Sequence, residues 1–128
     1  MKKMKKKDRP NIILTVLDTQ RVDHLSCYGY PEPTSPSLDR LAQQGTLFEQ
    51  AISPAQWTIP AHASIFTGQY PLLHQTVQSD RALPAELPTI AEILRAHGYH
   101  TFAFCNNPLV GVLDNGLRRG FDYFFNYA

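Results

Sequence analysis

A continuous apolar run near the start of the chain most narrows the choice of fold. Residues 11–17, Asn-Ile-Ile-Leu-Thr-Val-Leu, are rich in β-branched side chains and end abruptly at Asp18. Apolar residues without polar alternation are typical of a strand that is buried on both faces, as strands of parallel sheets are. The run therefore predicts a strand of a covered, parallel sheet.

Helical patterns alternate with further strand-like segments along the rest of the chain. Ser35-Pro36 is typical of an N-cap followed by the first residue of a helix, and Gly45 is expected to end that helix as its C′ residue. The other predicted elements are a strand over 46–52, a helix over 60–67 closed by Gly68, a surface loop over 69–87, a helix over 89–97, a strand over 99–105 and an aromatic-rich tail over 106–128. The sequence thus predicts an α/β fold, a mostly parallel sheet of three or four strands with flanking helices.

The charge of the chain is concentrated at its beginning. Residues 1–9 hold five Lys together with Asp8 and Arg9, whereas the whole chain has a formal net charge of +1, so the remainder is acidic on balance. The basic run has no aromatic residue and no amphipathic period, which favours a disordered leader over a nucleic-acid-binding arm. We therefore expect a leader over residues 1–9, a globular part over residues 10–128 and no nucleic-acid partner.

The sequence also bears on the compartment. No segment approaches the ~20 apolar residues that a membrane span needs, and no signal peptide is recognisable. Cys27 and Cys105 lie far apart without the spacing of metal ligands, and we interpret both as small buried residues. These features predict a cytoplasmic protein without a membrane span.

Asp18 is the first candidate for chemistry. A carboxylate at the carboxyl end of a strand lies where open α/β sheets bind ligands, which makes it a candidate metal ligand. An Asp that only caps the following loop is the structural alternative. His24 and His74 lie in predicted loops, where each could be a metal ligand or merely an exposed residue. His97 and His100 are expected to have helix-terminal or surface roles.

The segment Thr58-Ile-Pro-Ala-His62 is the second candidate. The first turn of a helix has N–H groups without helical partners, and together with the helix dipole they attract an anion such as a phosphoryl or sulfuryl group. A hydroxyl at Thr58 would point at that anion, but Thr is also a common N-cap for structural reasons. His62 lies on the same helical face, where it would contact the hydroxyl, the substrate or only water.

Several segments follow one another in a specific order. The first group is Arg-Pro-Asn-Ile-Ile-Leu-Thr-Val-Leu-Asp at 9–18, Cys-Tyr-Gly at 27–29, Thr-Ser-Pro-Ser-Leu-Asp-Arg-Leu at 34–41 and Gly-Thr-Leu-Phe at 45–48. The second group is Trp-Thr-Ile-Pro-Ala-His-Ala-Ser-Ile-Phe-Thr-Gly at 57–68, Tyr-Pro at 70–71, Leu-Arg-Ala-His-Gly-Tyr at 94–99 and Gly-Phe-Asp at 120–122. In this order the chain resembles the N-terminal part of the sulfatase family, within the alkaline-phosphatase superfamily.

The resemblance implies roles for particular residues. Asp18 would bind a divalent cation (calcium, magnesium, manganese or zinc), and Thr19 stands where the family usually has a second metal-binding Asp. Thr58 stands at the nucleophile of the Cys/Ser-x-Pro-x-Arg motif, where it would also contact the metal, and His62 takes the place of the Arg. Asn106, within Cys-Asn-Asn-Pro, falls at a substrate-binding Lys and would still donate a hydrogen bond.

These replacements indicate a Thr-type, sulfatase-like branch. Formylglycine, the oxidised Cys or Ser of classical members, cannot form from Thr58. A Thr ester lacks the second hydroxyl through which a formylglycine hydrate expels sulfate, so it must be cleaved by attack at sulfur or phosphorus, which is familiar for metal-activated water at phosphorus. The chemistry therefore favours small-molecule phosphoric mono- or diesters, with sulfate esters left open.

Family members are several times longer, and their second group of metal ligands lies beyond a segment like Gly120-Phe-Asp. We therefore expect residues 10–128 to be an incomplete catalytic domain that needs its missing C-terminal half or self-association. The leading hypothesis is an ester hydrolase whose isolated 128-residue chain is inactive. A truncated copy without turnover and a transferase of phosphoryl-linked headgroups are the alternatives.

Overall fold

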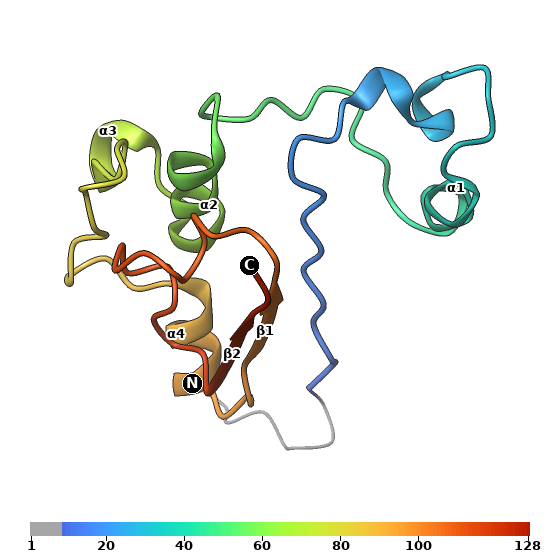
Figure 1. The fold of residues 1–128 in the computed structure, drawn as a ribbon. Helices are drawn as coiled ribbons and strands as arrows, with labels where there is room; N and C mark the ends of the chain where they lie inside the picture. The colour runs from blue at the N-terminus through green and yellow to red at the C-terminus, as the bar shows by residue number, and fades with distance from the viewer. Residues whose placement is uncertain (1–8) are drawn as a thin grey trace. The chain divides into compact units, whose positions relative to one another are not determined.

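The structure is a computed structural model that describes residues 9–128 (Figure 1). Contacts divide the chain into two compact units, Met1–Glu49 and Gln50–Ala128. The predicted basic leader lies outside the described residues except for Arg9. Among the described residues, no helix combines the length and the apolar character that crossing a bilayer requires.

Hydrogen bonds between short polar side chains hold the first unit together. Its helices are the 3-10 turns η2 (Val22–His24) and η3 (Ser26–Tyr28) and the helix α1 (Pro36–Gln44). The Ser26 hydroxyl donates to Asp39 Oδ2 at 2.7 Å, and the Ser26 backbone N–H donates to Ser35 Oγ at 3.1 Å. These bonds tie η3 to the first turn of α1.

Ser35 is the N-cap of α1, as predicted, although its hydroxyl does not cap the helix. The Oγ atom lies instead 2.9 Å from Ser26 Oγ and 3.3 Å from Asp39 Oδ1. Gly45 ends α1 at the predicted position, and its N–H donates to Leu41 O at 2.9 Å. Its backbone is extended, however, with φ −121° and ψ −156°, so it is not a left-handed C′ residue.

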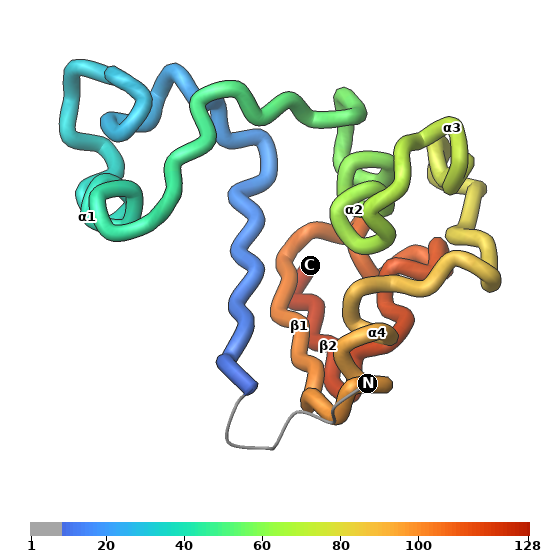
Figure 2. The backbone as a smooth tube through the Cα atoms, turned by 180° about the vertical axis from the view of Figure 1, so that it is seen from behind, coloured from blue at the N-terminus to red at the C-terminus, as the bar shows by residue number. Residues whose placement is uncertain are grey.

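The strand predicted over residues 11–17 was wrong. The segment follows an extended path (Figure 2), but it is not part of a ladder and every one of its residues is exposed, Ile13 by 87%. The strand predicted over 46–52 is also absent, and Ile52 is 90% exposed. A β-strand exists only where a second backbone accepts and donates its hydrogen bonds, and among residues 9–128 neither segment has such a partner.

The second unit has three helices, two of which lie at or near the predicted positions. They are α2 (Thr58–Thr67), α3 (Pro71–His74) and α4 (Ile90–Ala96). Gly68 closes α2 with φ 67°, a left-handed conformation that glycine adopts without strain. Thr89 caps α4 in a capping box, because its hydroxyl accepts from Glu92 N while Glu92 Oε2 accepts from Thr89 N. The one-turn helix α3 lies within the segment that we predicted to be a loop.

A parallel pair of strands completes the second unit. β1 (Phe102–Cys105) pairs with β2 (Tyr123–Asn126) in the register Phe102↔Tyr123 to Cys105↔Asn126. β1 falls within the strand predicted over 99–105, whereas β2 was not predicted. The α/β class is thus confirmed as a mixture of helices with a small parallel sheet, although among residues 9–128 the sheet has two strands rather than three or four.

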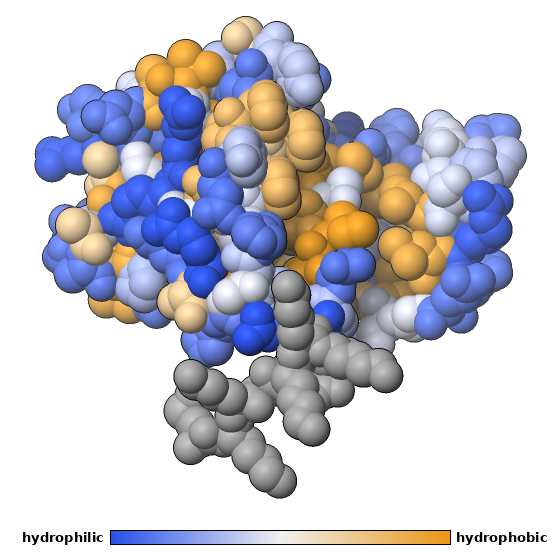
Figure 3. Space-filling view, turned by 90° about the horizontal axis from the view of Figure 1, so that it is seen from below, coloured by the Kyte–Doolittle hydropathy of each residue, from blue (hydrophilic) through white to orange (hydrophobic). Residues whose placement is uncertain are grey.

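The hydrophobic core of the second unit lies between α2, the segment after β1 and the loop at Leu83. Its buried members are Ala63, Phe66, Leu83, Val110 and Leu117, with Cys105, Phe121 and Phe124 packed against them. The other face of the strands carries two exposed, stacked aromatic pairs: Phe102 with Tyr123 and Phe104 with Phe125. Apolar residues are accordingly prominent at the surface (Figure 3).

Candidate active site

Asp18 and Thr19 lie at a tight turn that follows the apolar run. Gln20 N donates to Leu17 O at 3.2 Å, which closes the turn. Thr19 has φ 61°, a left-handed conformation that is unfavourable for a β-branched residue and costs about 1–3 kcal/mol. Both side chains are exposed. The turn therefore presents a carboxylate and a hydroxyl side by side on a strained backbone, a feature that is enriched at functional sites.

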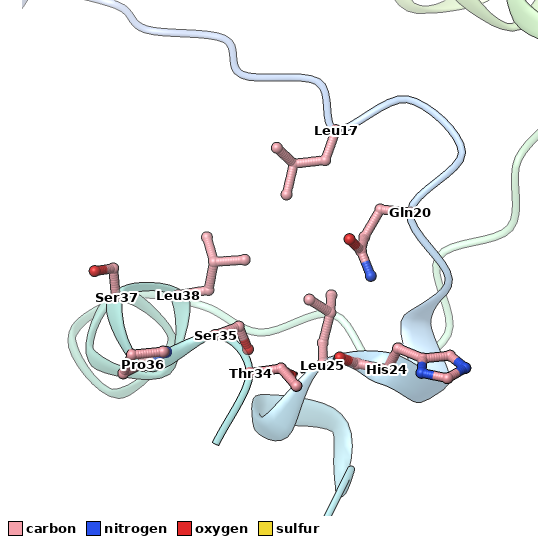
Figure 4. Close-up of a pocket in the computed structure, with 9 residues that line it drawn as sticks. All are labelled: Leu17, Gln20, His24, Leu25, Thr34, Ser35, Pro36, Ser37 and Leu38. Carbon is pink, nitrogen blue, oxygen red and sulfur yellow. Dashed lines mark hydrogen bonds between the residues drawn. The ribbon is translucent and has the colours of Figure 1, made fainter. Parts of the chain in front are cut away.

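A hollow of about 310 Å³ adjoins this turn within the first unit (Figure 4). The side chains of Leu17, Leu25 and Leu38 point into it, so its interior is mainly apolar. His24 lies at its margin, and its ring packs against that of Tyr30 at a centroid distance of 4.9 Å. His24 is thus a surface ring held by an aromatic neighbour, the second of the two roles that the sequence left open.

Thr58 is the first residue of α2, not its cap. The N-cap is Trp57, whose backbone is extended with φ −148° and ψ 171° and whose side chain makes no capping hydrogen bond. The predicted helix began at residue 60, so α2 begins two residues earlier than predicted. The N-cap position, where a Thr side chain most often stabilises a helix start, is thus occupied by Trp57.

His62 lies one turn further along α2 and binds the backbone of Thr58. Its Nδ1 donates to Thr58 O at 2.8 Å, because a carbonyl oxygen only accepts. The ring is 9% exposed and packs edge-to-face on Phe66 at 6.1 Å. These contacts fix the tautomer and the orientation of the imidazole, with Nε2 as its remaining polar atom. Two of the predicted site residues, Thr58 and His62, are thus connected by a hydrogen bond from the imidazole to the Thr58 backbone.

A second histidine, His74, is buried beneath α2 and was not recognised as such from the sequence. Its side chain is 0% exposed, Nδ1 accepts from Thr76 N at 3.0 Å, and Nε2 therefore donates to Ser64 Oγ at 3.0 Å. Burial lowers the pKa of His74, against a smaller opposite effect of a hydrogen bond with the Pro60 backbone. The neutral ring thus anchors the middle of α2, which makes it neither an exposed residue nor an available ligand.

Asn106 follows directly after β1, at the carboxyl end of a parallel strand, and is exposed. The neighbouring loop is held by Asn126 at the end of β2, whose Nδ2 donates to Asn107 O and Val110 O, both at 2.8 Å. Cys105 is half-buried, and its sulfur accepts from Asn107 N at 3.2 Å. This edge is where α/β sheets bind ligands, so the position of Asn106 suits its predicted contact with substrate.

The predicted metal ligands offer the oxygen atoms that a hard cation prefers, but they are too few to fill its coordination shell. Asp18, Thr19 and Thr58 offer only oxygen atoms, which Ca²⁺ and Mg²⁺ prefer, but such ions take about six or more oxygen ligands. Asp18 and Thr19 belong to the first unit and Thr58 to the second. Within residues 9–128, no group of three or more His, Cys, Asp or Glu side chains is arranged to hold a metal. A complete metal site would need further ligands.

Most of this chain is similar to known proteins. A family model described as Sulfatase matches residues 10–128. Among the relatives, the chain is 34% identical over 120 residues to the "Ulvan-active sulfatase" of Formosa agariphila, covering 90% of this chain and 24% of that protein. It is 39% identical over 98 residues to the human "Arylsulfatase A", covering 72% of this chain and 19% of that protein.

A solved structure gives the same result in three dimensions. The phosphonate monoester hydrolase of Agrobacterium radiobacter superposes with a TM-score of 0.82 at 27% identity, over 94% of this chain and 26% of that one. The chain therefore spans about a quarter or less of the length of these proteins. The matched segments cover 72% to 94% of this chain.

Proposed function

The chain belongs to the sulfatase family, and on that premise we propose that it carries the nucleophile and the first metal ligand of a metal-dependent hydrolase of phosphoric or sulfuric esters. Thr58 is the proposed nucleophile, and Asp18 the first metal ligand. Thr19 and Thr58 are further oxygen donors to the metal. His62 positions the nucleophile, and Asn106 contacts the substrate.

The observation that supports this proposal most strongly is the start of α2. Thr58 occupies its first position, next to the N–H groups that a helix leaves without intrahelical partners. The positive end of the helix dipole favours a phosphoryl or sulfuryl anion there, adjacent to the hydroxyl that would attack it. A half-buried hydroxyl at this place has the location that an attacking group needs.

The proposed reaction has two displacements. In the first, Thr58 Oγ loses its proton and attacks the phosphorus or sulfur atom in line with the leaving group, the bond to the departing oxygen breaks, and the alcohol leaves after taking up a proton. In the second, water attacks the same atom, the bond to Thr58 Oγ breaks, and the acid that contains the phosphorus or sulfur atom is released while Thr58 regains its proton. The net reaction is hydrolysis of one ester bond.

His62 acts on the nucleophile through the backbone. Its hydrogen bond to Thr58 O strengthens the first turn of α2 and holds the residue that must face the substrate. A classical Arg at this position would present several donors in a fixed fork, whereas the imidazole retains only Nε2. We therefore assign His62 to positioning, with Nε2 available as a substrate contact.

A divalent cation would supply charge neutralisation and an acidified oxygen nucleophile. Asp18 would hold it with its carboxylate, and the Thr19 hydroxyl beside it would bind the cation directly or through water. The left-handed backbone of Thr19 keeps these two adjacent side chains at the tip of the turn. Calcium or magnesium fits the oxygen donors better than zinc does.

Phosphorus is the favoured reacting centre. A threonyl ester lacks the elimination route that formylglycine offers to sulfate, and direct displacement by water is familiar at phosphorus. The protein with the similar solved structure is named a phosphonate monoester hydrolase, which agrees with phosphorus chemistry. We infer phosphoric or phosphonic esters as first substrates to test, with sulfate esters second.

The proposal concerns residues 10–128 as the N-terminal portion of a catalytic domain. The oxygen donors found here are too few for a divalent cation, so the other ligands are expected from residues outside this portion or from a second copy. A cytoplasmic location and the absence of a nucleic-acid partner stay predictions.

Turnover of 4-nitrophenyl phosphate, bis(4-nitrophenyl) phosphate, 4-nitrophenyl phenylphosphonate and 4-nitrophenyl sulfate tests the assignment. In the protein that contains this portion, Thr58→Ala should lower turnover by roughly three orders of magnitude or more, as removal of a nucleophile does. Thr58→Ser should retain part of the activity, because the hydroxyl survives with a less restricted rotamer.

Thr67→Ala is the matched control at the other end of α2. Thr67 is also half-buried, but its hydroxyl donates to Ala63 O at 2.6 Å and thereby serves the helix itself. Turnover should survive this substitution. Undiminished hydrolysis by stably folded Thr58→Ala would return Thr58 to a structural role and remove the centre of the proposal.

A further inference from the structure

Trp57 is a conspicuous residue at the start of α2. It is the only tryptophan of the 128-residue chain, it forms the N-cap of α2, and it directly precedes Thr58. Its side chain is 38% exposed. The largest apolar side chain of the chain thus lies partly in water beside the proposed nucleophile.

Helix capping does not account for a tryptophan at this position. Ser, Thr, Asp and Asn are preferred at N-caps because their side-chain oxygen accepts from a first-turn N–H. The indole of Trp57 has no such acceptor and makes no capping hydrogen bond. A small polar residue at this position would stabilise α2 better.

Trp57 also lies outside the hydrophobic core of the second unit. The hydrophobic cluster of the second unit is built from Ala63, Phe66, Leu83, Val110 and Leu117, and Trp57 is not a member. Within residues 9–128, the indole ring stacks on no other aromatic ring and its Nε1–H donates no recorded hydrogen bond. Tryptophans usually satisfy this donor when they are buried for structural reasons.

We propose that Trp57 is a specificity-determining residue, a flat surface on which the leaving group of the ester stacks, and that it favours esters of aromatic alcohols. This inference rests on the proposed hydrolysis at Thr58. The departing oxygen must lie in line with the attacking one, so the leaving group extends beyond the phosphorus and away from Thr58 Oγ. A side chain at position 57 must therefore be long to contact the leaving group. Indole is the largest rigid apolar side chain among the standard amino acids.

The chemistry of indole selects the class of leaving group. Its π-face stacks on planar rings in offset geometry, a contact worth more than the apolar area that it buries. A cyclic but non-planar alkyl group gains only the burial. Trp57 should therefore favour phenyl over cyclohexyl esters by about three- to tenfold, beyond any difference in their intrinsic reactivity.

The test compares kcat/KM for phenyl phosphate and cyclohexyl phosphate in wild type and variants. Trp57→Ala should lower the phenyl value by about three- to tenfold and change the cyclohexyl value by less than about twofold. Trp57→Phe should restore most of the preference, since it returns an aromatic face. The ratio of kcat/KM for phenyl phosphate to kcat/KM for cyclohexyl phosphate is compared between variants. The different intrinsic reactivities of the two esters cancel in this comparison.

Tyr70→Ala is the matched control. Tyr70 is also an aromatic N-cap in the second unit, at the start of α3, without a side-chain capping hydrogen bond and 72% exposed. It does not adjoin Thr58, so both esters should be hydrolysed as by wild type. An equal loss for both esters in Trp57→Ala, or no loss, would overturn the inference while leaving the role of Thr58 intact.

A fluorescence titration tests the same contact without turnover. Trp57 is the only tryptophan of these 128 residues, and the difference in emission between wild type and Trp57→Phe isolates its contribution in the protein that contains this portion. Phenylphosphonate should change the emission saturably, whereas ethylphosphonate should do so weakly or not at all. Lack of a saturable response to phenylphosphonate would contradict the stacking role, whereas lack of turnover by wild type would contradict the proposed hydrolysis.

Discussion

The two units of this chain are stabilised by different interactions. Every fully or nearly buried hydrophobic residue among residues 9–128 lies in the second unit, from Ile59 to Leu117. In the first unit the most buried described residue is a serine, Ser35, and apolar side chains such as Ile13 and Phe48 are exposed. Short hydrogen bonds take the place of a core there. Hydrogen bonds contribute about 1 kcal/mol each whereas a buried leucine contributes several, so the second unit should be the more stable.

The largest predicted effect comes from comparing the truncation of one leucine in each unit. Leu117 is 0% exposed and belongs to the core of the second unit, whereas Leu41 on α1 is 64% exposed. Leu117→Ala should lower the free energy of unfolding by about 3 kcal/mol, because it removes buried methyl groups and leaves a cavity. Leu41→Ala should change it by less than about 0.5 kcal/mol. Urea unfolding followed by far-UV circular dichroism measures both, and equal losses would show that the first unit buries Leu41 in solution.

A smaller effect is expected from His74, which gives the second unit a dependence on pH. Its replacement by Ala should cost about 2 kcal/mol at pH 7.5, because Ser64 Oγ and Thr76 N lose their buried partner.

The sign of the pH dependence follows from the lowered pKa of His74. Its imidazole is neutral in the fold and takes up a proton more readily when the chain unfolds. The stability that it contributes is therefore fully present above about pH 6.5 and falls as the pH drops below that value. Unfolding of wild type and His74→Ala at pH 7.5 and 5.5 measures the difference. Equal pH dependence of the two proteins would refute this assignment.

The smallest predicted effect concerns the hydrogen bonds of the first unit. Asp39→Ala removes the acceptor of Ser26 Oγ and Ser35 Oγ, and it should lower the local stability of α1 by about 1–2 kcal/mol. The second unit should be unaffected. Amide hydrogen exchange of residues in α1 and α2 distinguishes the two units.

Asp23→Ala provides the control for Asp39. Asp23 pairs with Arg21 at 2.5 Å, but both side chains are largely exposed, at 58% and 71%. An exposed ion pair of this kind contributes little. Its removal should leave amide exchange in α1 unchanged, and an effect as large as that of Asp39→Ala would mean that net charge, not the network, stabilises the first unit.

The helices were predictable because their signals are local. Ser35-Pro36 and Gly68 each act within one turn, and each marks a helix boundary that the structure confirms. The Thr89-x-x-Glu92 capping box at the start of α4 is a further local signal, which the prediction did not use. The strands depend on distant partners. β2 contains an alternation, with Tyr123 and Phe125 outward and Phe124 inward, that could have identified it. The run over 11–17 had the stronger pattern but pairs with no strand among the described residues.

The burial of single side chains is also hard to predict from a local pattern, as the segment around His74 shows. Leu72 and Leu73 are 84% and 62% exposed, while the polar His74 between them and Gln75 is completely buried. Hydrophobicity alone predicts the opposite. A local bond from Thr76 N and a tertiary contact with Ser64 together satisfy both ring nitrogens, and this makes burial of the imidazole favourable.

The sequence by itself determined the family, the helices and the candidate residues Asp18, Thr58 and His62, because ordered motifs and cap signals are carried by residues close together in the chain. Tertiary structure decided which segments pair as strands and that His74 is buried with its imidazole bonded to Ser64 on α2. These features depend on groups that meet only after the chain has folded, and their free energy comes from burial and hydrogen bonds that no local pattern encodes.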